Sequence, residues 1–217
     1  MKLQFKQQQF QLDAVASVVD IFAGQGKHSG FDYHMDKGLG MDAELDMNFI
    51  GFRNAPIQLS QDTVSQQVRT QQLRYGLKPS ETLSVQDVNG RSSYNLTIEM
   101  ETGTGKTYTY IRTLMELNKQ YGWLKFIIVV PSIAIREGVL KSFQIMADHF
   151  QMEYGKKPRY FVYDSSRLGE LDKFANSSDI QVMIINSQAF NASGADARRI
   201  HTEQESFRWR KPIDVIA

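Results

Sequence analysis

The 217-residue sequence contains no cysteine and only four histidines. The absence of cysteine excludes disulfides, thiolate zinc sites and cysteine nucleophiles, and it is typical of proteins that stay in a reducing compartment. No two histidines are four residues apart, so the sequence does not indicate a histidine metal site on one helix face. We therefore expect a cytoplasmic protein whose chemistry depends on other side chains.

The chain also lacks long apolar runs and a strong net charge. No stretch approaches the roughly 18 apolar residues that a membrane span needs, and the N-terminus lacks the apolar core of a signal peptide. We therefore expect no membrane association. Lysine and arginine number 25 against 24 acidic residues, a net charge of +1. Charge alone does not indicate nucleic-acid binding, but a small basic patch can be offset elsewhere, so binding is not excluded.

The first part of the chain gives weak structural signals. Residues 12–22 carry apolar side chains at helical spacing. Residues 24–93 are rich in glycine, glutamine and serine, which is typical of loops with one or two helices, and Asn89-Gly90 predicts a polar turn. We expect an N-terminal helix within residues 1–23 and a loop-rich insertion at 24–93.

From Tyr94 onward, strand and helix patterns alternate. Strand patterns occupy residues 95–100, 126–130, 159–163 and 181–185, and helical patterns occupy 107–121 and 133–150. The run at 126–130 is continuously apolar and stops at a proline, as expected for a strand buried on both faces of a parallel sheet. The alternation predicts an α/β fold in which helices flank a mostly parallel sheet.

A glycine-rich run at residues 100–107 lies between a predicted strand and a predicted helix. Gly103 and Gly105 permit backbone angles that present successive N–H groups to phosphate oxygens. Lys106 is placed to reach the β- and γ-phosphates, and the Thr107 hydroxyl is a magnesium ligand in such loops. We interpret the run as a phosphate-binding loop for ATP with Mg2+, because a strand enters it and a helix leaves it.

Met100 stands where the usual phosphate-loop expression has its first glycine. A Thr-Gly-x-Gly-Lys-Thr ending after a non-glycine resembles motif I of superfamily 2 helicases. Residues 129–138 resemble motif Ia of these enzymes, and residues 184–190 occupy the place of their next motif that contacts nucleic acid. Residues 10–15 resemble the glutamine motif that recognises adenine.

A narrower resemblance follows from residues 99–107, 130–137 and 186–191. Together they are similar to the Res subunit of type III restriction-modification enzymes, over residues 11–22 and about 94–191. The resemblance implies a RecA-like motor domain at 94–217 and ATP-driven movement, or a change of state, on double-stranded DNA. It also implies a methyltransferase (Mod) partner that reads the recognition sequence, and DNA cleavage by the complete enzyme.

The resemblance also implies roles for single residues. Gln11 would hydrogen-bond adenine and select ATP. The phosphates and magnesium would be held by Thr102, Gly103, Thr104, Gly105, Lys106 and Thr107, with Lys106 and Thr107 as the catalytic members and Thr107 on the metal. Three further residues would contact DNA phosphates, namely Ser132, Arg136 and Ser187.

Plainer interpretations stay open for several of these residues. Gln11 could be an exposed residue at a helix start, Ser132 a simple helix N-cap, and Arg136 a solvated surface charge. For the chain as a whole, one alternative is a superfamily 2 helicase or translocase of repair or phage defence without a nuclease. Another is a module that binds nucleotide or a partner without catalysis.

Residues 211–217 resemble the approach to another strand. In the family that the chain resembles, an Asp-Glu pair follows at this point, and a second RecA-like domain and nuclease carboxylates come later. None of these is in the sequence. We therefore expect an N-terminal fragment whose motor domain is incomplete at its C-terminus, and which is inactive alone because the missing groups contribute orders of magnitude in rate.

Overall fold

The computed structural model describes residues 5–28, 30–34, 50–88, 91–190 and 200–216. The chain folds as two compact units. One comprises Met1–His28 and Ala55–Gly122, and the other comprises Ser29–Asn54 and Trp123–Ala217. In the described part, no helix is both long enough and apolar enough to cross a membrane.

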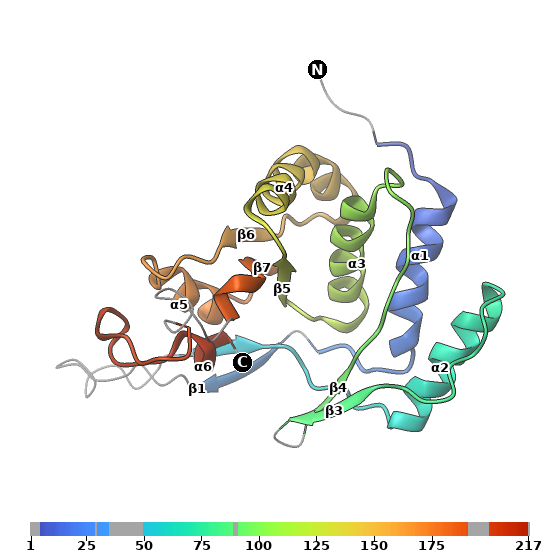
Figure 1. Cartoon of the computed structure of the whole chain (residues 1–217), viewed down its shortest axis with the longest axis horizontal. Coiled ribbons are helices and arrows are strands. Elements are labelled where there is room, and N and C mark those ends of the chain that lie inside the picture. The colour runs from blue at the N-terminus through green and yellow to red at the C-terminus, as the bar shows by residue number, and fades with distance from the viewer. Residues whose placement is uncertain (1–4, 29, 35–49, 89–90, 191–199, 217) are drawn as a thin grey trace. The chain divides into compact units, whose positions relative to one another are not determined.

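The first unit consists of helices and one hairpin. Its elements are α1 (Gln9–Val19), the 3₁₀ turn η1 (Asp20–Phe22), α2 (Gln61–Arg74), β3 (Val85–Val88), β4 (Arg91–Tyr94) and α3 (Lys106–Tyr121). α1 and α3 pack side by side (Figure 1). At the end of α3, the Tyr121 hydroxyl donates to the carbonyl of Val19 at 2.8 Å, and its ring lies edge-on to Phe22. α1 lies within residues 1–23, where the sequence predicts an N-terminal helix.

α3 is bounded by glycine at both ends. Gly105 is its N-cap and Gly122 its C-cap, and both have positive φ angles, 87° and 76°. Ile111 and Met115 lie on the buried face and are 0% and 1% exposed. A left-handed C-cap glycine satisfies carbonyls of the last helical turn, so the predicted end of this helix is confirmed.

The second unit holds the sheet. Its elements are β1 (Phe31–His34), β2 (Ile50–Arg53), β5 (Lys125–Val130), α4 (Ile133–Tyr154), β6 (Arg159–Val162), α5 (Gly169–Asn176), β7 (Gln181–Asn186), η2 (Ser187–Phe190), η3 (Glu205–Phe207) and α6 (Pro212–Ile216). β1 and β2 form an antiparallel pair, and β5, β7 and β6 form a parallel sheet with β7 in the middle. The predicted α/β class with a parallel sheet is confirmed.

α4 and α5 cover opposite faces of the parallel sheet (Figure 1). Successive residues of a strand point to opposite faces. Tyr160 of β6 stacks on Phe143 of α4, whereas the next residue, Phe161, lies edge-on to Phe174 of α5. The sheet is therefore packed between helices, as expected for parallel strands joined by helical crossovers.

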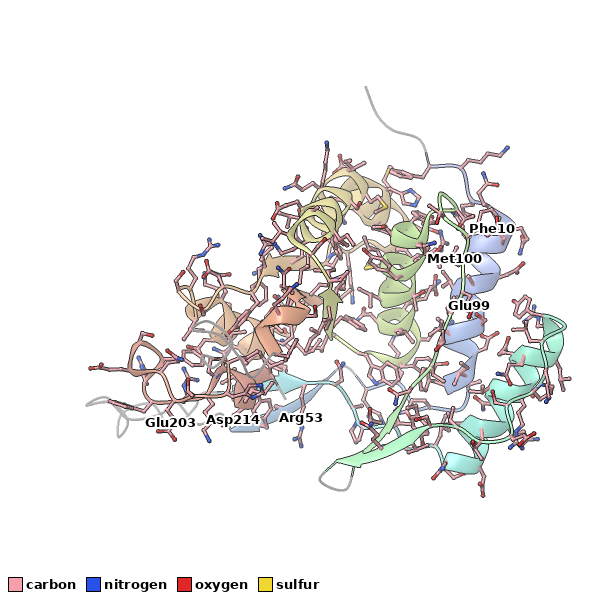
Figure 2. All side chains as sticks on the ribbon, in the orientation of Figure 1. Phe10, Arg53, Glu99, Met100, Glu203 and Asp214 are labelled. Carbon is pink, nitrogen blue, oxygen red and sulfur yellow. The ribbon has the colours of Figure 1, made fainter. Side chains whose placement is uncertain are left out.

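The strand predicted at residues 95–100 is wrong. Asn95 donates from its backbone to Ser84, which extends the β3–β4 pairing by one bond, and no ladder follows it in the described structure. Figure 2 shows Glu99 and Met100 on this extended stretch. An apolar pattern becomes a strand only where a neighbouring strand supplies partners for its N–H and C=O groups. Ile98 is accordingly 44% exposed.

The strand predicted at 126–130 exists as β5, but the expectation that it is buried on both faces is wrong. Ile127 and Val129 are 41% and 53% exposed, because β5 is an edge strand of the described sheet. Full burial belongs instead to β7, in which residues 182–185 are at most 1% exposed. A continuous apolar run does not distinguish a central strand from an edge strand.

The C-terminal residues also differ from expectation. Residues 212–216 form the short helix α6 rather than the approach to a strand. Proline is well suited to the first position of a helix, and Pro212 occupies it. Ile213, Val215 and Ile216 pack against the apolar cluster around α5. α5, β1 and β2 were not predicted, and the turn predicted at Asn89-Gly90 lies outside the described residues, although β3 and β4 pair on either side of it.

Lys125 joins the start of β5 to the C-terminal end of α5. Its Nζ donates to the carbonyls of Phe174 and Ser177, and the ammonium lies 5.3 Å from the Phe174 ring centroid. Burial lowers the pKa of Lys125 to about 8, and the nearby Asp179 opposes this shift in part. The folded state therefore holds the Lys125 proton less tightly than the unfolded chain does.

This difference predicts a pH dependence of stability. Between about pH 8 and the ordinary lysine pKa of 10.5, the unfolded state binds more protons at Lys125 than the folded state. The free energy of unfolding should therefore rise with pH in this window. Urea unfolding at a series of pH values, compared with Lys125→Met, isolates the effect because the variant lacks the proton. A difference between the two proteins that stays constant from pH 7.5 to 10.5 would contradict the prediction.

Candidate nucleotide-binding site

The glycine-rich loop has the backbone geometry that its sequence predicts. Gly103 and Gly105 have φ angles of 82° and 87°, in the left-handed region that other residues avoid. A Cβ added at Gly103 would meet nothing within 4 Å, so this glycine leaves open space over the loop. A Cβ at Gly105 would overlap the amide nitrogen of Gln11. Gly103 thus keeps the space over the loop open, whereas Gly105 lets the Gln11 side chain pack closely against the loop.

The helix after the loop starts without a side-chain cap. Gly105 is the N-cap of α3 and has no side chain to accept from the first-turn N–H groups. α4 differs, because its N-cap Ser132 accepts a hydrogen bond from the backbone of Ile135. The first N–H groups of any helix lack intrahelical acceptors and carry the positive end of the helix dipole. The start of α3 is therefore suited to an anion such as a phosphate.

Lys106 and Thr104 close the loop on itself. The Lys106 ammonium donates to the carbonyls of Met100 at 2.6 Å and Glu101 at 2.9 Å, and the Thr104 hydroxyl donates to Glu101 at 2.6 Å. An ammonium has three N–H donors, so these two carbonyls leave one for another acceptor. These bonds are exposed to water, so an incoming phosphate can exchange for them at low cost.

Gln11 connects α1 to the loop, 93 residues farther along the chain. Its side-chain amide donates to the carbonyl of Thr104 at 2.8 Å and is half-buried. The second N–H and the Oε1 of Gln11 have no partner among the residues that the structure describes. A glutamine amide pairs with the N6 and N7 edge of adenine through one donor and one acceptor. Gln11 therefore retains the groups needed to read adenine while it holds the loop.

Thr102 and Thr107 lie in the loop and at the start of the helix that follows it, as the sequence predicts. Thr102 is exposed in the loop, and Thr107 is half-buried in the first turn of α3. A hydroxyl at this point is a hard oxygen ligand of the kind that magnesium prefers. The nucleotide-site residues predicted in the first unit are thus brought together around one helix terminus.

The three residues predicted to contact DNA belong to the second unit. Ser132 is the N-cap of α4, and Ser187 is the exposed first residue of η2. They follow the ends of neighbouring parallel strands, where Val130 pairs in register with Asn186. Arg136 lies one turn into α4, and its guanidinium donates to Glu137 at 3.0 Å. Ser132 caps α4 by accepting from the backbone of Ile135, and its hydroxyl has no other partner among the residues that the structure describes.

Sequence reasoning missed Gln188. Its side-chain amide donates to the carbonyl of Pro131 at 2.9 Å and so links the loop after β7 to the loop after β5. In the sequence, it is one polar residue in a polar stretch beside Ser187. The signal available was its place within residues 184–190, the segment that resembles a motif contacting nucleic acid.

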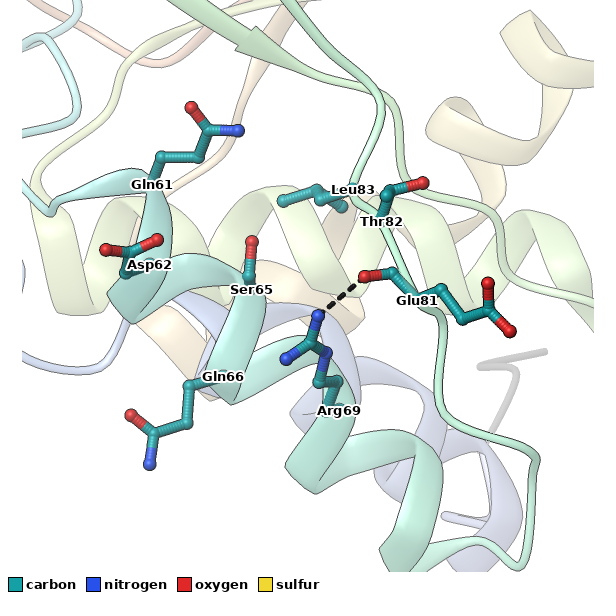
Figure 3. Close-up of a pocket in the computed structure, with 8 residues that line it drawn as sticks. All are labelled: Gln61, Asp62, Ser65, Gln66, Arg69, Glu81, Thr82 and Leu83. Carbon is teal, nitrogen blue, oxygen red and sulfur yellow. Dashed lines mark hydrogen bonds between the residues drawn. The ribbon is translucent and has the colours of Figure 1, made fainter.

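A separate hollow of about 700 Å³ lies in the first unit between α2 and the segment that follows it (Figure 3). Its lining comprises Gln61, Asp62, Ser65, Gln66, Arg69, Glu81, Thr82 and Leu83. The Arg69 guanidinium donates to the carbonyls of Ser80 at 3.0 Å and Glu81 at 2.7 Å. Arg69 thus joins α2 to the segment at Ser80 and Glu81. None of the predicted site residues lines this hollow.

A glycine loop that runs into a helix without a side-chain cap is typical of P-loop proteins, although no strand enters this loop in the described structure. The family model described as "Type III restriction enzyme, res subunit" matches residues 57–210. The chain belongs to this family, as the resemblance implied, and its fold is that of a RecA-like helicase domain. The match begins inside residues 24–93, for which the sequence predicts a loop-rich insertion.

Curated relatives agree with the family. The chain is 31% identical over 189 residues to the Res subunit of the type III restriction-modification enzyme EcoP15I of Escherichia coli, which covers 75% of this chain and 19% of the relative. It is 39% identical over 95 residues to the EcoPI Res subunit of Escherichia phage P1, covering 38% of this chain and 10% of that relative. The StyLTI Res subunit of Salmonella typhimurium strain LT2 is 34% identical over 124 residues, 46% of this chain and 12% of the relative. The chain spans about a fifth or less of the length of these relatives.

The loop geometry predicts that the two glycines respond differently to substitution. Gly103→Ala and Gly105→Ala each place a Cβ in the left-handed region, at a cost of about 1–2 kcal/mol. Gly105→Ala also displaces Gln11 from Thr104, which costs about 1 kcal/mol more. Urea unfolding should show this order. In a Gln11→Ala background the extra cost should disappear, and equal costs for the two glycines in both backgrounds would refute the packing argument.

Proposed function

We propose that this chain is the ATP-binding part of the DNA-dependent ATPase and translocase subunit of a type III restriction endonuclease. The complete enzyme would cut double-stranded DNA in the cytoplasm together with a methyltransferase (Mod) subunit. The observation that carries the proposal is the open glycine loop before the uncapped start of α3, in a chain of the Res family. The similarity to Res subunits of type III restriction-modification enzymes supports the rest.

In this proposal the loop binds the phosphates of ATP. The N–H groups from Gly103 to Thr107 would point at phosphate oxygens, and Lys106 would move from the carbonyls of Met100 and Glu101 to the β- and γ-phosphates. Thr107 would hold magnesium, whose charge offsets that of the phosphates when the ion is bound. Because both hydrogen bonds of Lys106 are exposed to water, this movement breaks no buried interaction.

Gln11 would provide the base selectivity. Its free acceptor and second donor match the N6 amino group and N7 of adenine, whereas guanine presents two acceptors at the corresponding edge. Since Gln11 also holds the carbonyl of Thr104, adenine binding and loop position are linked through one side chain. A site for ATP rather than GTP follows.

DNA would be held by the second unit. Ser132 and Ser187 follow adjacent strand ends and offer hydroxyl groups there, and Arg136 adds a guanidinium one turn away. The exposed Arg136–Glu137 pair is worth little in water, so a DNA phosphate can replace the carboxylate. These contacts would fix a DNA strand by its backbone without reading its sequence, which fits a partner that reads the recognition site.

The first test of this proposal is Lys106→Ala in the complete protein that carries this chain. Loss of the ammonium removes a charge aimed at the transferred phosphoryl group, so the ATPase rate should fall at least about a hundredfold. Phosphate release with and without DNA measures the rate. Lys119→Ala is the matched control, because Lys119 lies exposed on the same helix. Full activity of Lys106→Ala would end the ATPase proposal.

The second test concerns the base. Gln11→Ala should raise the KM for ATP about tenfold, equal to about 1.4 kcal/mol, and raise the KM for GTP less, because GTP loses only the loop contact to Thr104 and discrimination therefore shrinks. Steady-state ATPase and GTPase rates give the ratio. Gln9→Ala is the control, since Gln9 lies on the same helix and bonds only its neighbour Asp13 among described residues. An unchanged ATP to GTP ratio in Gln11→Ala would show that adenine is read elsewhere.

A further inference from the structure

The loops after β5 and β7 leave the parallel ladder together and then part. Val130 and Asn186 form the last pair in register. From there one chain runs through Pro131 into α4, and the other turns directly into η2 at Ser187. Beyond the ladder, regular backbone pairing no longer sets the distance between them. Any ligand that touches both loops depends on how that distance is held.

Gln188 provides a link at this point. Its amide Nε2 donates to the carbonyl of Pro131 at 2.9 Å, across 57 residues of sequence. The carbonyl of Pro131 belongs to the same rigid peptide unit as the backbone nitrogen of Ser132. Gln188 therefore orients the peptide that leads into the N-cap of α4. Because Gln188 directly follows Ser187 in the chain, its hydrogen bond links the loop of Ser187 to the loop of Ser132.

Ser132 needs such support. Its own cap bond, accepted from the backbone of Ile135, is long at 3.3 Å and exposed. Its backbone is extended, with φ −146° and ψ 160°, a broad region that does not fix the side chain by itself. A second hold on the preceding peptide narrows the positions that the Ser132 hydroxyl can take relative to Ser187.

The Gln188 bond contributes little to folding. It is exposed, and water competes for both partners, so its net contribution to stability is at the low end for a hydrogen bond. The strand ends on either side are already held by the ladder and by the buried residues of β7. A role in setting the relative position of two loops accounts for the bond better than a role in stability.

We propose that Gln188 is a positioning residue for DNA, which sets the spacing between Ser132 and Ser187 so that both hold the phosphates of one strand. This inference rests on the proposed function, because it assumes that these two hydroxyls contact DNA. Gln188 acts on DNA through the two serine hydroxyls, and its own side chain is neutral. The salt dependence of DNA binding therefore belongs to Arg136, whose loss should reduce the slope of log affinity against log salt by about 1.

The test is DNA-stimulated ATPase activity of the complete protein, with duplex DNA of mixed sequence as the probe. Gln188→Ala should raise the DNA concentration for half-maximal stimulation about fivefold, with an unchanged salt slope, KM for ATP and urea unfolding midpoint. Gln188→Glu keeps the size but replaces the donor with an acceptor, so it should weaken DNA at least as much. Gln144→Ala is the matched control, because Gln144 is exposed on α4 and lies about 18 Å from Ser132 along the helix.

A double variant separates positioning from direct contact. If Gln188 acts through Ser132, Gln188→Ala should have little further effect in a Ser132→Ala background, whereas an independent DNA contact would give additive effects. Additive effects, a lowered unfolding midpoint, or a response equal to that of Gln144→Ala would each overturn the positioning role. If Arg136→Ala also leaves DNA stimulation and its salt slope unchanged, the proposed DNA contact itself fails, and the two failures are thereby distinguished.

Discussion

The parallel pairing of β7 with both of its neighbours is the constraint on which the second unit depends. β7 bonds to β5 along six residues and to β6 along four, and its residues 182–185 are almost fully buried. Burial on both faces fixes the register, because a shift of one residue would turn every side chain to the other face. The register, in turn, places the ends of β5 and β7 side by side. Ser132 and Ser187 therefore follow neighbouring strand ends, although 54 residues lie between them in the sequence.

The first unit depends on a different constraint, the positive φ angles of Gly103 and Gly105. The left-handed glycines turn the loop so that α3 begins without a side-chain cap, and the carbonyls of Met100 and Glu101 accept hydrogen bonds from Lys106. Lys106 thus has two backbone acceptors without a ligand, and both of these hydrogen bonds are exposed to water. Such a loop keeps its shape in water and can still exchange its lysine, which a buried ion pair would not allow.

Much of the fold was predictable from sequence, because local patterns determine it. α3 has a glycine at each end and an apolar face, and β7 is a continuous apolar run, so both were predicted within a residue or so. The predictions that failed depend on which strands lie next to one another, and not on the pattern within one strand. Residues 95–100 carry a strand pattern without a neighbour, and the apolar run of β5 lies at an edge. Sequence periodicity contains no information on which strand lies next to which.

The candidate site divides in the same way. The loop from Thr102 to Thr107 is contiguous, so its geometry follows from its own residues, and the left-handed glycines agree with what the sequence predicts. The links to that loop are not contiguous. The contact of Gln11 with Thr104 spans 93 residues and that of Gln188 with Pro131 spans 57. Gln11 was found through a family resemblance, whereas Gln188 lies inside a segment that carries the resemblance, residues 186–191, without a role of its own having been predicted.

These two glutamines share a physical logic with two other long-range contacts. Gln25 donates to the carbonyl of Pro56 at 3.1 Å, and Asn54 donates to that of Lys125 at 2.7 Å. In each case a neutral side-chain amide donates to a backbone carbonyl that is far away in the sequence. A charged strut would add its own field beside a phosphate site, since an acid would repel the ligand and a base would bind it unselectively. Neutral amides fix the loops and leave the recognition of phosphate to backbone N–H groups, Lys106 and Arg136.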